Sequence, residues 1–447
     1  MLDIQFIRDN AELVKEKSKQ KQETVDIDKL LVLDGRRREL LSKTEGLRKQ
    51  RNELADKFKA SKPSPEEVER GKQLKENLSK LESELDPVDA EFNRLLRAVP
   101  NIPLDDVPVG ESEDDNIVAK TVGEPIKFDF EPKNHAEIAI TKGWLDKERA
   151  AKVTGARFAY LKGDLVKLQF AVIQFVIETL TNEQTIKTII QEAELKNVSS
   201  KPFIPVLPPA MVRTEVYDAM DRLEPREERY KVGSNEDNLW LQGSAEHTMG
   251  PMHMGELLPL QDLPIRYLGY ATSFRREAGT YGKDTEGIIR MHQFDKLEME
   301  SFVNPQGGML EHLFLVAVQE YLMRKLKLPY RVLQKCTADI GKPNARGIDI
   351  EVWLPGQGKY LETHTADFMT DYQARRLGIK VKHIPPPGQI VEYNTNNPPT
   401  DFAHTNDATA FALGRTMVGI IENYQTKDGD VKVPDVLKPY IGNKQLI

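Results

Sequence analysis

A four-three spacing of buried-type residues runs through two long segments near the start of this 447-residue chain. The first segment places such residues at Leu33, Arg37, Leu40, Thr44, Leu47, Arg51, Leu54 and Phe58. The second repeats the same steps at Leu74, Leu78, Leu81, Leu85, Val88, Phe92 and Leu95. A heptad seam of this kind is typical of helices that pair along their length. Because only a short connection separates the segments, they predict an antiparallel coiled-coil hairpin over about residues 30–97.

The start of the second segment carries the signals of a helix N-terminus. Ser64 suits the N-cap, Pro65 suits the first helical position, and Glu67 can complete a capping box. Inside the same segment, Pro87 should kink the helix or restart it with Asp86 as a new cap.

The two predicted helices differ in charge. The first carries nine Lys/Arg against five Asp/Glu, whereas the second carries six against nine. Two interpretations fit this difference. The charges can be the solvated outer faces of a coiled coil, or the basic side can bind nucleic acid.

A Pro-rich exit over residues 100–108 and an acidic stretch over residues 111–115 follow the hairpin, and together they predict a linker. We therefore place a domain boundary near residue 110, with domains at 1–110 and 111–447. In the second domain, short β-branched runs at 330–333 and 348–354 alternate irregularly with helical runs at 165–180 and 310–327. This pattern predicts an α+β domain built on a mainly antiparallel sheet flanked by helices.

Composition limits the classes of function. With 70 acidic and 63 basic residues, the net charge of -7 argues against a protein that coats nucleic acid over its whole surface. The single cysteine, Cys336, allows no internal disulfide and no cysteine cluster for zinc. The sequence has no secretion signal at its start and no run of 18 apolar residues, so we expect a cytoplasmic protein with no membrane partner.

Two short runs at 274–277 and 290–298 combine cations, carboxylates and an aromatic ring on either side of a Gly-bearing turn, and they predict a β-hairpin. The hairpin would bring Arg275 and Arg290 near a polyphosphate. Glu277 and Phe294 would offer a hydrogen-bond acceptor and a stacking face to a purine. These groups suit ATP. The turn residues are Gly279, Thr280, Tyr281, Gly282 and Lys283.

A second cation can reach the same nucleotide from downstream. Gly414 and Arg415 enter an amphipathic helical run, so Arg415 could lie over a ring that stacks on Phe294. No glycine-rich phosphate loop is present in the sequence, so arginines must hold the phosphates. His247 and His253 could be metal ligands, but hydrogen-bonded pocket or core histidines are the favoured interpretation.

Taken in order along nearly the whole chain, six motifs resemble those of bacterial-type seryl-tRNA synthetases. They are Gly155–Asp164, Pro208-Pro209, Ser244-Ala245-Glu246, the hairpin, Asp371–Arg376 and Gly414-Arg415-Thr416. The resemblance implies a class II synthetase fold and a ligase that activates L-serine with ATP and charges serine tRNA. It also implies a homodimer with Pro208-Pro209 at the interface, and a coiled-coil arm that grips the tRNA. Whether a selenocysteine tRNA is also charged stays open.

The resemblance further implies a role for each matching residue. Arg275, Glu277 and Arg415 would be the catalytic residues, and Mg²⁺ would be held by Glu362 and Thr365, with no zinc. The implied ATP contacts are Arg275, Arg276, Glu277, Arg290, Phe294, Glu362, Thr363, His364, Thr365 and Arg415. The implied serine contacts are Ser244, Ala245, Glu246, Arg275, Glu298 and Thr409.

This chain departs from the commonest family pattern at three places. It has Ser244 where many relatives have Thr, Thr363-His364-Thr365 where they have Ile-Ser-Ser, and Asp407-Ala408-Thr409 where they have Asn-Gly-Ser. His364 and Asp407 are the larger chemical changes. Two other classes of protein stay open as alternatives. One is a non-catalytic paralogue that acts as an RNA-binding scaffold, and the other is an aminoacyl ligase for a carrier protein, which would need no full-length arm.

Overall fold

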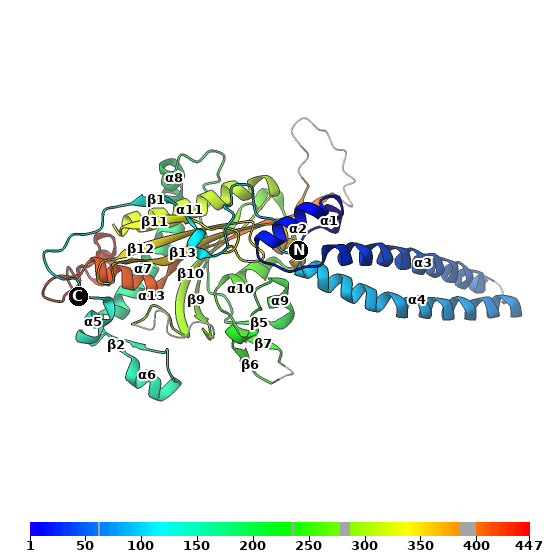
Figure 1. Ribbon diagram of the computed structural model, residues 1–447, viewed down its shortest axis with the longest axis horizontal. Coiled ribbons are helices and arrows are strands. Elements are labelled where there is room, and N and C mark those ends of the chain that lie inside the picture. The colour runs from blue at the N-terminus through cyan, green and yellow to red at the C-terminus, as the bar shows by residue number, and fades with distance from the viewer. Residues whose placement is uncertain (61–62, 235–236, 278–286, 384–398) are drawn as a thin grey trace. The chain divides into compact units, whose positions relative to one another are not determined.

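The computed structural model describes residues 1–60, 63–234, 237–277, 287–383 and 399–447. The chain forms two compact units, Met1–Ile102 and Pro103–Ile447 (Figure 1). The division falls before residue 110 because the exit segment is hydrogen-bonded into the larger unit. Leu104 N donates to Ala345 O at 2.9 Å, and Thr337 N donates to Pro108 O at 2.8 Å. Residues 103–110 are therefore part of the second unit and not a free linker.

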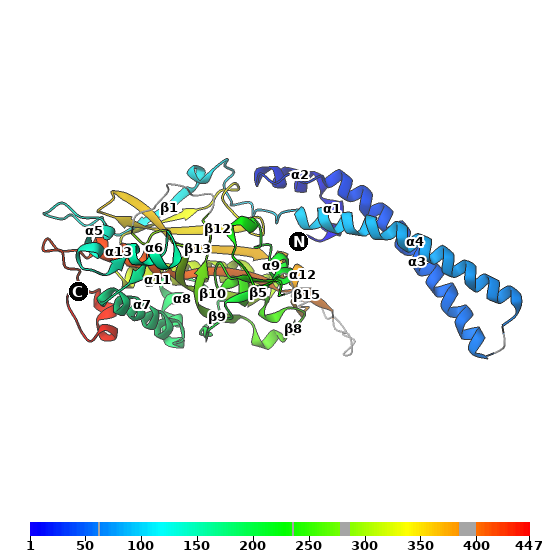
Figure 2. The same ribbon diagram turned by 90° about the horizontal axis from the view of Figure 1, so that it is seen from below.

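The first unit is helical, and its two long helices form the predicted hairpin (Figures 1 and 2). Its helices are α1 (Ile4–Asp9), α2 (Ala11–Gln20), α3 (Ile27–Ala60) and α4 (Pro65–Ala98). The seam is buried at Leu40, Thr44, Leu54, Leu74, Leu78, Phe92 and Leu95. The seam positions Leu33, Arg37, Leu47, Phe58, Leu81, Leu85 and Val88 are half-buried, and Arg51 is exposed. The coiled-coil prediction is confirmed.

The N-terminus and the interior proline of α4 test two predictions that were made from local sequence. Ser64 Oγ accepts from Glu67 N at 3.2 Å, and Glu67 Oε2 accepts from Ser64 N at 2.9 Å, which is the predicted capping box. Because α4 continues through Pro87, the predicted restart with Asp86 as a new cap is wrong, and the alternative of a kink at Pro87 stays a prediction. A proline inside a helix costs about 3 kcal/mol. Burial of the seam on both sides of Pro87 offsets that cost.

The second unit is built on an eight-stranded sheet, in the order β1-β11-β12-β13-β16-β10-β9-β4. Neighbouring strands are antiparallel except β4 and β9, which are parallel. The strands are β1 (Ile117–Val122), β4 (Ile204–Val206), β9 (Ile265–Phe274), β10 (Gln293–Val303), β11 (Tyr330–Gln334), β12 (Arg346–Leu354), β13 (Lys359–Thr370) and β16 (His404–Ala412). The predicted α+β class with a mainly antiparallel sheet is confirmed.

Smaller strands and helices surround this sheet. The strands are β2 (Leu145–Asp146), β3 (Tyr160–Leu161), β5 (Met211–Arg213), β6 (Lys231–Val232), β7 (Leu239–Leu241), β8 (Leu257–Leu258), β14 (Lys380–Lys382) and β15 (Thr400–Phe402). The helices are α5 (His135–Thr141), α6 (Lys147–Thr154), α7 (Asp164–Leu180), α8 (Glu183–Glu192), α9 (Thr214–Ala219), α10 (Glu246–Met249), α11 (Gly308–Lys325), α12 (Tyr372–Leu377) and α13 (Leu413–Asn423).

The two faces of the sheet have different covers. Successive residues of a strand point to opposite faces of the sheet. On β10, Leu297 and Met299 pack in the main core with α11 and α13, whereas Phe302 packs in a second cluster with α10 and α12. On this second face, a Cβ at Gly269 of β9 would lie 2.5 Å from Met249 Sδ, so glycine is required where α10 packs closely. The remaining part of this face carries a cavity.

Candidate active site

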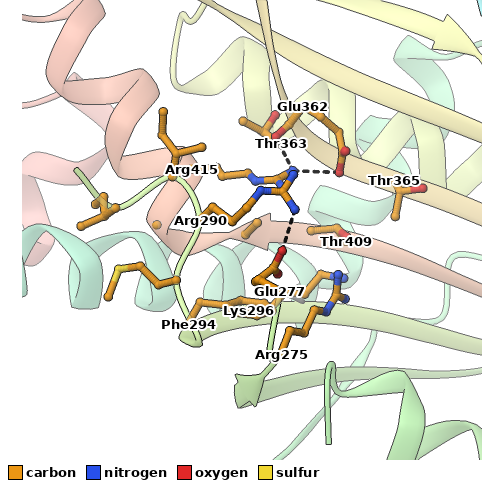
Figure 3. A pocket seen from close by; sticks show the side chains of 15 residues that line it. Arg275, Glu277, Arg290, Phe294, Lys296, Glu362, Thr363, Thr365, Thr409 and Arg415 are labelled. Carbon is orange, nitrogen blue, oxygen red and sulfur yellow. Dashed lines mark hydrogen bonds and ion pairs between the residues drawn. The ribbon is translucent and has the colours of Figure 1, made fainter. Parts of the chain in front are cut away.

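An open cavity of about 280 Å³ lies over β10, β13 and β16, where the sheet meets the start of α13 (Figure 3). Most of the residues that the sequence assigns to ATP line it. The lining residues are Arg275, Glu277, Ile288, Ile289, Arg290, Met291, Phe294, Lys296, Glu362, Thr363, Thr365, Thr409, Ala412, Gly414 and Arg415.

The hairpin positions the first group of these side chains. Strands β9 and β10 pair with Phe274 opposite Gln293. The pairing extends beyond the strands, because Arg275 N donates to His292 O at 3.0 Å. Arg275 and Arg290 therefore meet at the same end of the sheet. The predicted turn residues Gly279, Thr280, Tyr281, Gly282 and Lys283 lie outside the described residues.

Arg275 is held in place by the neighbouring chain. Its Nε donates to Gly243 O at 2.9 Å. Its guanidinium carbon lies 5.4 Å from the centre of the Phe294 ring. The cation and the aromatic ring thus share one wall of the cavity, as the hairpin pattern predicts.

Glu277 is paired within the hairpin and braced from outside it. Arg290 Nη1 donates to Glu277 Oε2 at 2.6 Å (Figure 3). Arg157 Nη1 donates to the Glu277 carbonyl at 3.0 Å, and Arg157 O accepts from His292 N at 3.0 Å. Glu277 has a φ of 51°, in the left-handed region that costs a non-glycine residue about 1 kcal/mol or more. The Gly155–Asp164 motif therefore stabilises the conformation of the hairpin.

Arg415 enters the cavity from the first turn of α13. Its Nη1 donates to the Glu362 carbonyl at 2.9 Å and lies 3.0 Å from Glu362 Oε1 (Figure 3). The Glu362 side chain is 48% exposed. A guanidinium and a carboxylate are thus both presented to the cavity.

A bulge in β13 decides which residues of the segment 362–365 face the cavity. Ile350 lies opposite His364, but the next residue, Glu351, lies opposite Glu362, so Thr363 is the extra residue. Glu362, Thr363 and Thr365 line the cavity.

His364 does not line the cavity. Its ring centre lies 5.1 Å from that of Phe411, and its Nδ1 is 2.8 Å from Thr363 Oγ1. Burial lowers the pKa of His364 to about 3, so the ring is neutral at pH 7. The position of His364 therefore gives no support to an ATP contact, and the change from serine at this position leaves the cavity wall untouched.

Arg276 also lies outside the cavity lining. It is exposed, its guanidinium lies 5.7 Å from the centre of the Tyr230 ring, and its backbone N donates to Glu228 O at 3.0 Å. Arg275 therefore faces the cavity, whereas Arg276 does not.

Of the residues assigned to serine, Arg275 and Thr409 line the cavity, whereas Ser244, Ala245, Glu246 and Glu298 are not part of its lining. Lys296 lines the cavity, donates to Ser244 Oγ at 3.1 Å and pairs with Glu298 Oε2 at 2.6 Å. Thr409 lies opposite Glu298 across the sheet and also lines the cavity. Ala245 and Glu246 are buried beside this group.

Burial and neighbouring charges shift the pKa values of this group. Burial raises the pKa of Glu298 to about 8, against the opposing effect of Lys296. Burial also lowers the pKa of His247, whose neutral ring lies 3.3 Å from Glu246 Oε1. Although burial alone would raise the pKa of Glu246, nearby positive charges, including Lys296 and Arg222, lower it. Glu246 is therefore the ionised member at neutral pH.

Lys296 is the functional candidate that our sequence analysis missed. A signal for it exists, because Phe294, Lys296 and Glu298 are two residues apart on one strand and so share a face. Other missed residues are the apolar lining at Ile288, Ile289 and Met291. They lie just before the strand, where no periodic pattern applies.

The two histidines considered as metal ligands are hydrogen-bonded instead. Tyr217 Oη lies 2.8 Å from His247 Nδ1, and His253 contacts Glu256 at 2.8 Å and Tyr267 at 2.9 Å. Within the described ranges, no group of three His, Cys, Asp or Glu residues has the geometry to hold a metal by itself. No helix in the described part of the chain is both long and apolar enough to cross a membrane.

Comparison with known proteins identifies the family of the chain. Residues 230–424 match the tRNA synthetase class II core domain (G, H, P, S and T), so fold and site define a class II aminoacyl-tRNA synthetase. Residues 1–103 match the seryl-tRNA synthetase N-terminal domain. The chain is 37% identical over 450 residues to the serine–tRNA ligase of Citrifermentans bemidjiense, covering 100% of both chains. The chain belongs to the seryl-tRNA synthetase family.

Other relatives and solved structures extend the similarity. The serine–tRNA ligase of Nitrosopumilus maritimus is 36% identical over 452 residues, again covering 100% of both chains. The crystal structure of seryl-tRNA synthetase from Pyrococcus horikoshii complexed with ATP is similar with a TM-score of 0.84 and 34% identity, covering 100% of this chain and 99% of that one. The cytoplasmic enzyme of Naegleria fowleri in complex with AMP gives 0.82 and 27%, covering 100% and 98%.

Proposed function

We propose that this chain is a serine–tRNA ligase that activates L-serine with ATP and transfers the seryl group to serine tRNA. The observation that carries the proposal is the gathering of Arg275, Glu277, Phe294 and Arg415 around one cavity, with Lys296 and Thr409 at its floor. Family membership over the full length supports it. So does the ATP that the similar Pyrococcus horikoshii structure contains.

In the first step, the serine carboxylate attacks the α-phosphorus of ATP. A carboxylate–phosphorus bond forms, the bond to the β-phosphate oxygen breaks, and pyrophosphate leaves. No general base is needed, because the carboxylate is already ionised at pH 7. The obstacle is the repulsion between the carboxylate and the phosphates. Arg275 would neutralise the α-phosphate, and its hydrogen bond to Gly243 O keeps the guanidinium oriented before the nucleotide arrives.

In the second step, a ribose hydroxyl of the terminal adenosine of tRNA attacks the carbonyl carbon of seryl-adenylate, and AMP leaves. The adenine is expected to stack on Phe294 with Arg415 on its other face, a cation–π contact of about 0.5–2 kcal/mol. The ion pair of Arg415 with Glu362 fixes the position of that guanidinium. Positioning then supplies much of the acceleration in both steps.

Magnesium would bind at the end of the cavity near β13. Hard cations prefer oxygen ligands, and the Glu362 carboxylate and the Thr365 hydroxyl both line the cavity. Thr365 Oγ1 and Asp349 Oδ1 are buried with no hydrogen-bond partner among the described residues, and Asp349 lies opposite Thr365. This donor set fits Mg²⁺. When bound, the ion would screen the charge of the triphosphate.

Serine selection would depend on hydrogen bonds to its hydroxyl. Glu298 and Thr409 lie opposite each other on β10 and β16 and offer a carboxyl and a hydroxyl group. A site that binds a hydroxyl in this way strongly rejects an analogue that lacks it, because its own polar groups are left unpaired. Alanine should therefore be rejected by hydrogen bonding, and threonine by the available space.

The remaining parts of the chain suit tRNA binding and dimerisation. We assign the lysine and arginine side chains of α3 to the backbone of the serine tRNA, because phosphates attract clustered lysine and arginine side chains. We also propose a homodimer with its contact near Pro208-Pro209. Three apolar residues there are exposed, Ile204 at 53%, Leu207 at 81% and Met211 at 45%, and β4 is an edge strand. The reaction would take place in the cytoplasm, where charged tRNA is used.

Pyrophosphate exchange measured with each of the amino acids in turn tests the proposal. We expect exchange that depends on serine and far exceeds that with alanine or threonine. Exchange with no amino acid, or with another amino acid in preference to serine, would contradict the proposed activity.

A further inference from the structure

Three buried acidic side chains form a row across the sheet next to the predicted serine site. Glu300 lies opposite Asp407, and Asp407 lies opposite Asp367, on the neighbouring strands β10, β16 and β13. Their exposed fractions are 0%, 3% and 7%. Glu298 lies two residues before Glu300 on β10, and Thr409 lies two residues after Asp407 on β16. Residues two apart on a strand share a face, so the acidic row is adjacent to Glu298 and Thr409 on the same face of the sheet.

Arg222 provides the positive charge for this row. Its Nη2 donates to Asp407 Oδ2 at 3.2 Å, and it lies 3.5 Å from Asn344 Oδ1. The side chains of Arg222 and Asp407 are 17% and 4% exposed. Among the described residues, neither carboxylate oxygen of Glu300 has a hydrogen-bond partner. Arg222 is the cation that forms an ion pair with this row, while Lys296 also lowers the pKa of Asp407, and Lys335 lies near Asp367.

The segment that carries Arg222 is held by helix α12. Arg376 donates to Asp218 O at 2.6 Å and to Ala219 O at 2.8 Å. Tyr372 Oη donates to Asp221 Oδ2 at 3.0 Å. These side chains belong to the Asp371–Arg376 motif, which has no part in the proposed nucleotide site. The motif thus fixes the position from which Arg222 reaches the sheet.

We propose that the Arg222–Asp407 ion pair determines amino-acid specificity. In this proposal, which rests on the proposed function, the pair closes the serine site beyond Glu298 and Thr409 and neutralises the buried row. A side chain that ends in a neutral hydroxyl is then accepted. A side chain that ends in an ammonium is rejected, because it would lie near the Arg222 guanidinium.

Removal of the guanidinium should reverse this preference. The row would lose the cation that pairs with Asp407, and an uncompensated buried charge favours any cation that can reach it. L-2,3-diaminopropionate is serine with an ammonium group in place of the hydroxyl. It is therefore the probe that fits the changed site. Asp407→Asn in addition to Arg222→Met should remove much of the attraction for the ammonium group of diaminopropionate, because a neutral amide then replaces the carboxylate that contacts Arg222.

Pyrophosphate exchange with L-serine and L-2,3-diaminopropionate tests this role in four full-length proteins: wild type, Arg222→Met, Arg222→Lys and the double variant. For Arg222→Met we expect the serine KM to rise about tenfold with kcat within about threefold, and the kcat/KM ratio of diaminopropionate to serine to rise at least tenfold. Arg222→Lys keeps the charge and should keep the wild-type ratio. The double variant should return the ratio most of the way to wild type.

A buried arginine outside the cavity provides the matched control. Arg266 forms an ion pair with Glu311 at 2.6 Å and is 1% exposed, so Arg266→Gln should lower the melting temperature without changing the substrate ratio. If Arg222→Met fails to fold, Arg222→Gln replaces it with the same expectation. The proposal is overturned if Arg222→Met or Arg222→Gln folds and keeps the wild-type kcat/KM ratio of diaminopropionate to serine. It is also overturned if the double variant keeps the raised ratio.

The same assay separates failure of this inference from failure of the proposed function. Serine-dependent exchange by the wild-type enzyme tests the function, whereas the substrate ratio of the variants tests Arg222. If the wild type activates another amino acid in preference to serine, the proposed function is wrong. In that case, an Arg222→Met variant with the same amino-acid preference as the wild type would also contradict the role of Arg222. If the wild type activates no amino acid, both fall.

Discussion

At the residue scale, each guanidinium of the proposed nucleotide site is oriented by a partner within the protein. Arg275 donates to Gly243 O, Arg290 pairs with Glu277, and Arg415 pairs with Glu362. Charged groups fixed before the substrate binds need little reorganisation during the reaction. Arginines on a rigid sheet can therefore replace the glycine-rich loop that many nucleotide-binding proteins use.

Adjacent arginines give the sharpest test at this scale. Arg275→Ala should reduce kcat for serine-dependent pyrophosphate exchange about 10²–10³-fold, because a group aimed at the reacting phosphate is lost. Arg276→Ala should stay within threefold of wild type, because Arg276 lies outside the cavity lining. Equal losses in the two variants would contradict the placement of these side chains.

A buried histidine should make stability depend on pH. Burial, with a smaller effect from Arg346, lowers the pKa of His312 to about 3 from the ordinary value of 6.5. Below pH 6.5 the unfolded chain binds a proton that the folded chain does not bind until about pH 3. Stability is therefore complete above pH 6.5 and is lost as the pH falls, by about 1.4 kcal/mol per pH unit, or about 2 kcal/mol at pH 5.

His312→Phe should remove this acid-dependent loss. Urea unfolding at pH 5 and pH 7 measures the free energy of unfolding of both proteins. The difference between the two pH values should be about 2 kcal/mol smaller in the variant than in wild type. An identical pH dependence in both proteins would show that His312 has the same pKa in the folded protein as in the unfolded chain.

The sequence predicts which residue types gather at the site better than which way they face. Nine of the residues that the family resemblance assigns to substrates line the cavity, including Arg275, Glu362 and Thr409. His364 does not line the cavity, because the bulge at Thr363 changes which side chains of β13 point to that face of the sheet. Bulges leave no reliable pattern in the sequence, so this change could not be predicted. The implied contacts of individual residues with ATP and serine stay predictions.

At the element scale, the coiled-coil hairpin and the sheet differ in how much the sequence reveals. The hairpin depends on contacts between segments that follow each other, so heptads and one capping box were enough to predict it. The sheet order pairs distant segments, such as β13 at Lys359–Thr370 with β16 at His404–Ala412. Local patterns cannot reveal such pairings, so we predicted the type of sheet but not its strand order.

The uninterrupted α4 helix gives a prediction about stability. Pro87→Ala should stabilise the protein by about 2 kcal/mol, because it restores a helical hydrogen bond and removes a steric clash, at a smaller cost in unfolded-chain entropy. Hydrogen exchange of the α4 amide groups in the full-length protein measures this change. Unchanged or faster exchange in the variant would indicate that the helix ends at Asp86 in solution.

At the scale of the whole molecule, the two compact units correspond to the two tasks of the proposed reaction. The larger unit, Pro103–Ile447, contains the whole cavity. The smaller unit, Met1–Ile102, contains the coiled-coil hairpin. Adenylate formation should therefore need only the larger unit, and recognition of tRNA should need both.

Deletion of the arm tests this division. A variant in which a short Gly/Ser linker replaces residues 33–97 should keep serine-dependent pyrophosphate exchange within about threefold of wild type. Its charging of serine tRNA should fall at least 100-fold, because the lysine and arginine side chains of α3 are lost. A ligase for a carrier protein would lose nothing in its transfer step, and a non-catalytic RNA-binding protein would show no exchange in either form.

The most direct test of the proposed site is a crystal structure with a non-hydrolysable seryl-adenylate analogue. We expect the adenine to lie between Phe294 and Arg415, and the group that replaces the phosphate to lie within hydrogen-bond distance of Arg275. The serine hydroxyl should contact Glu298 or Thr409. An adenine bound away from Phe294, or an Arg275 guanidinium turned away from the analogue, would contradict the account.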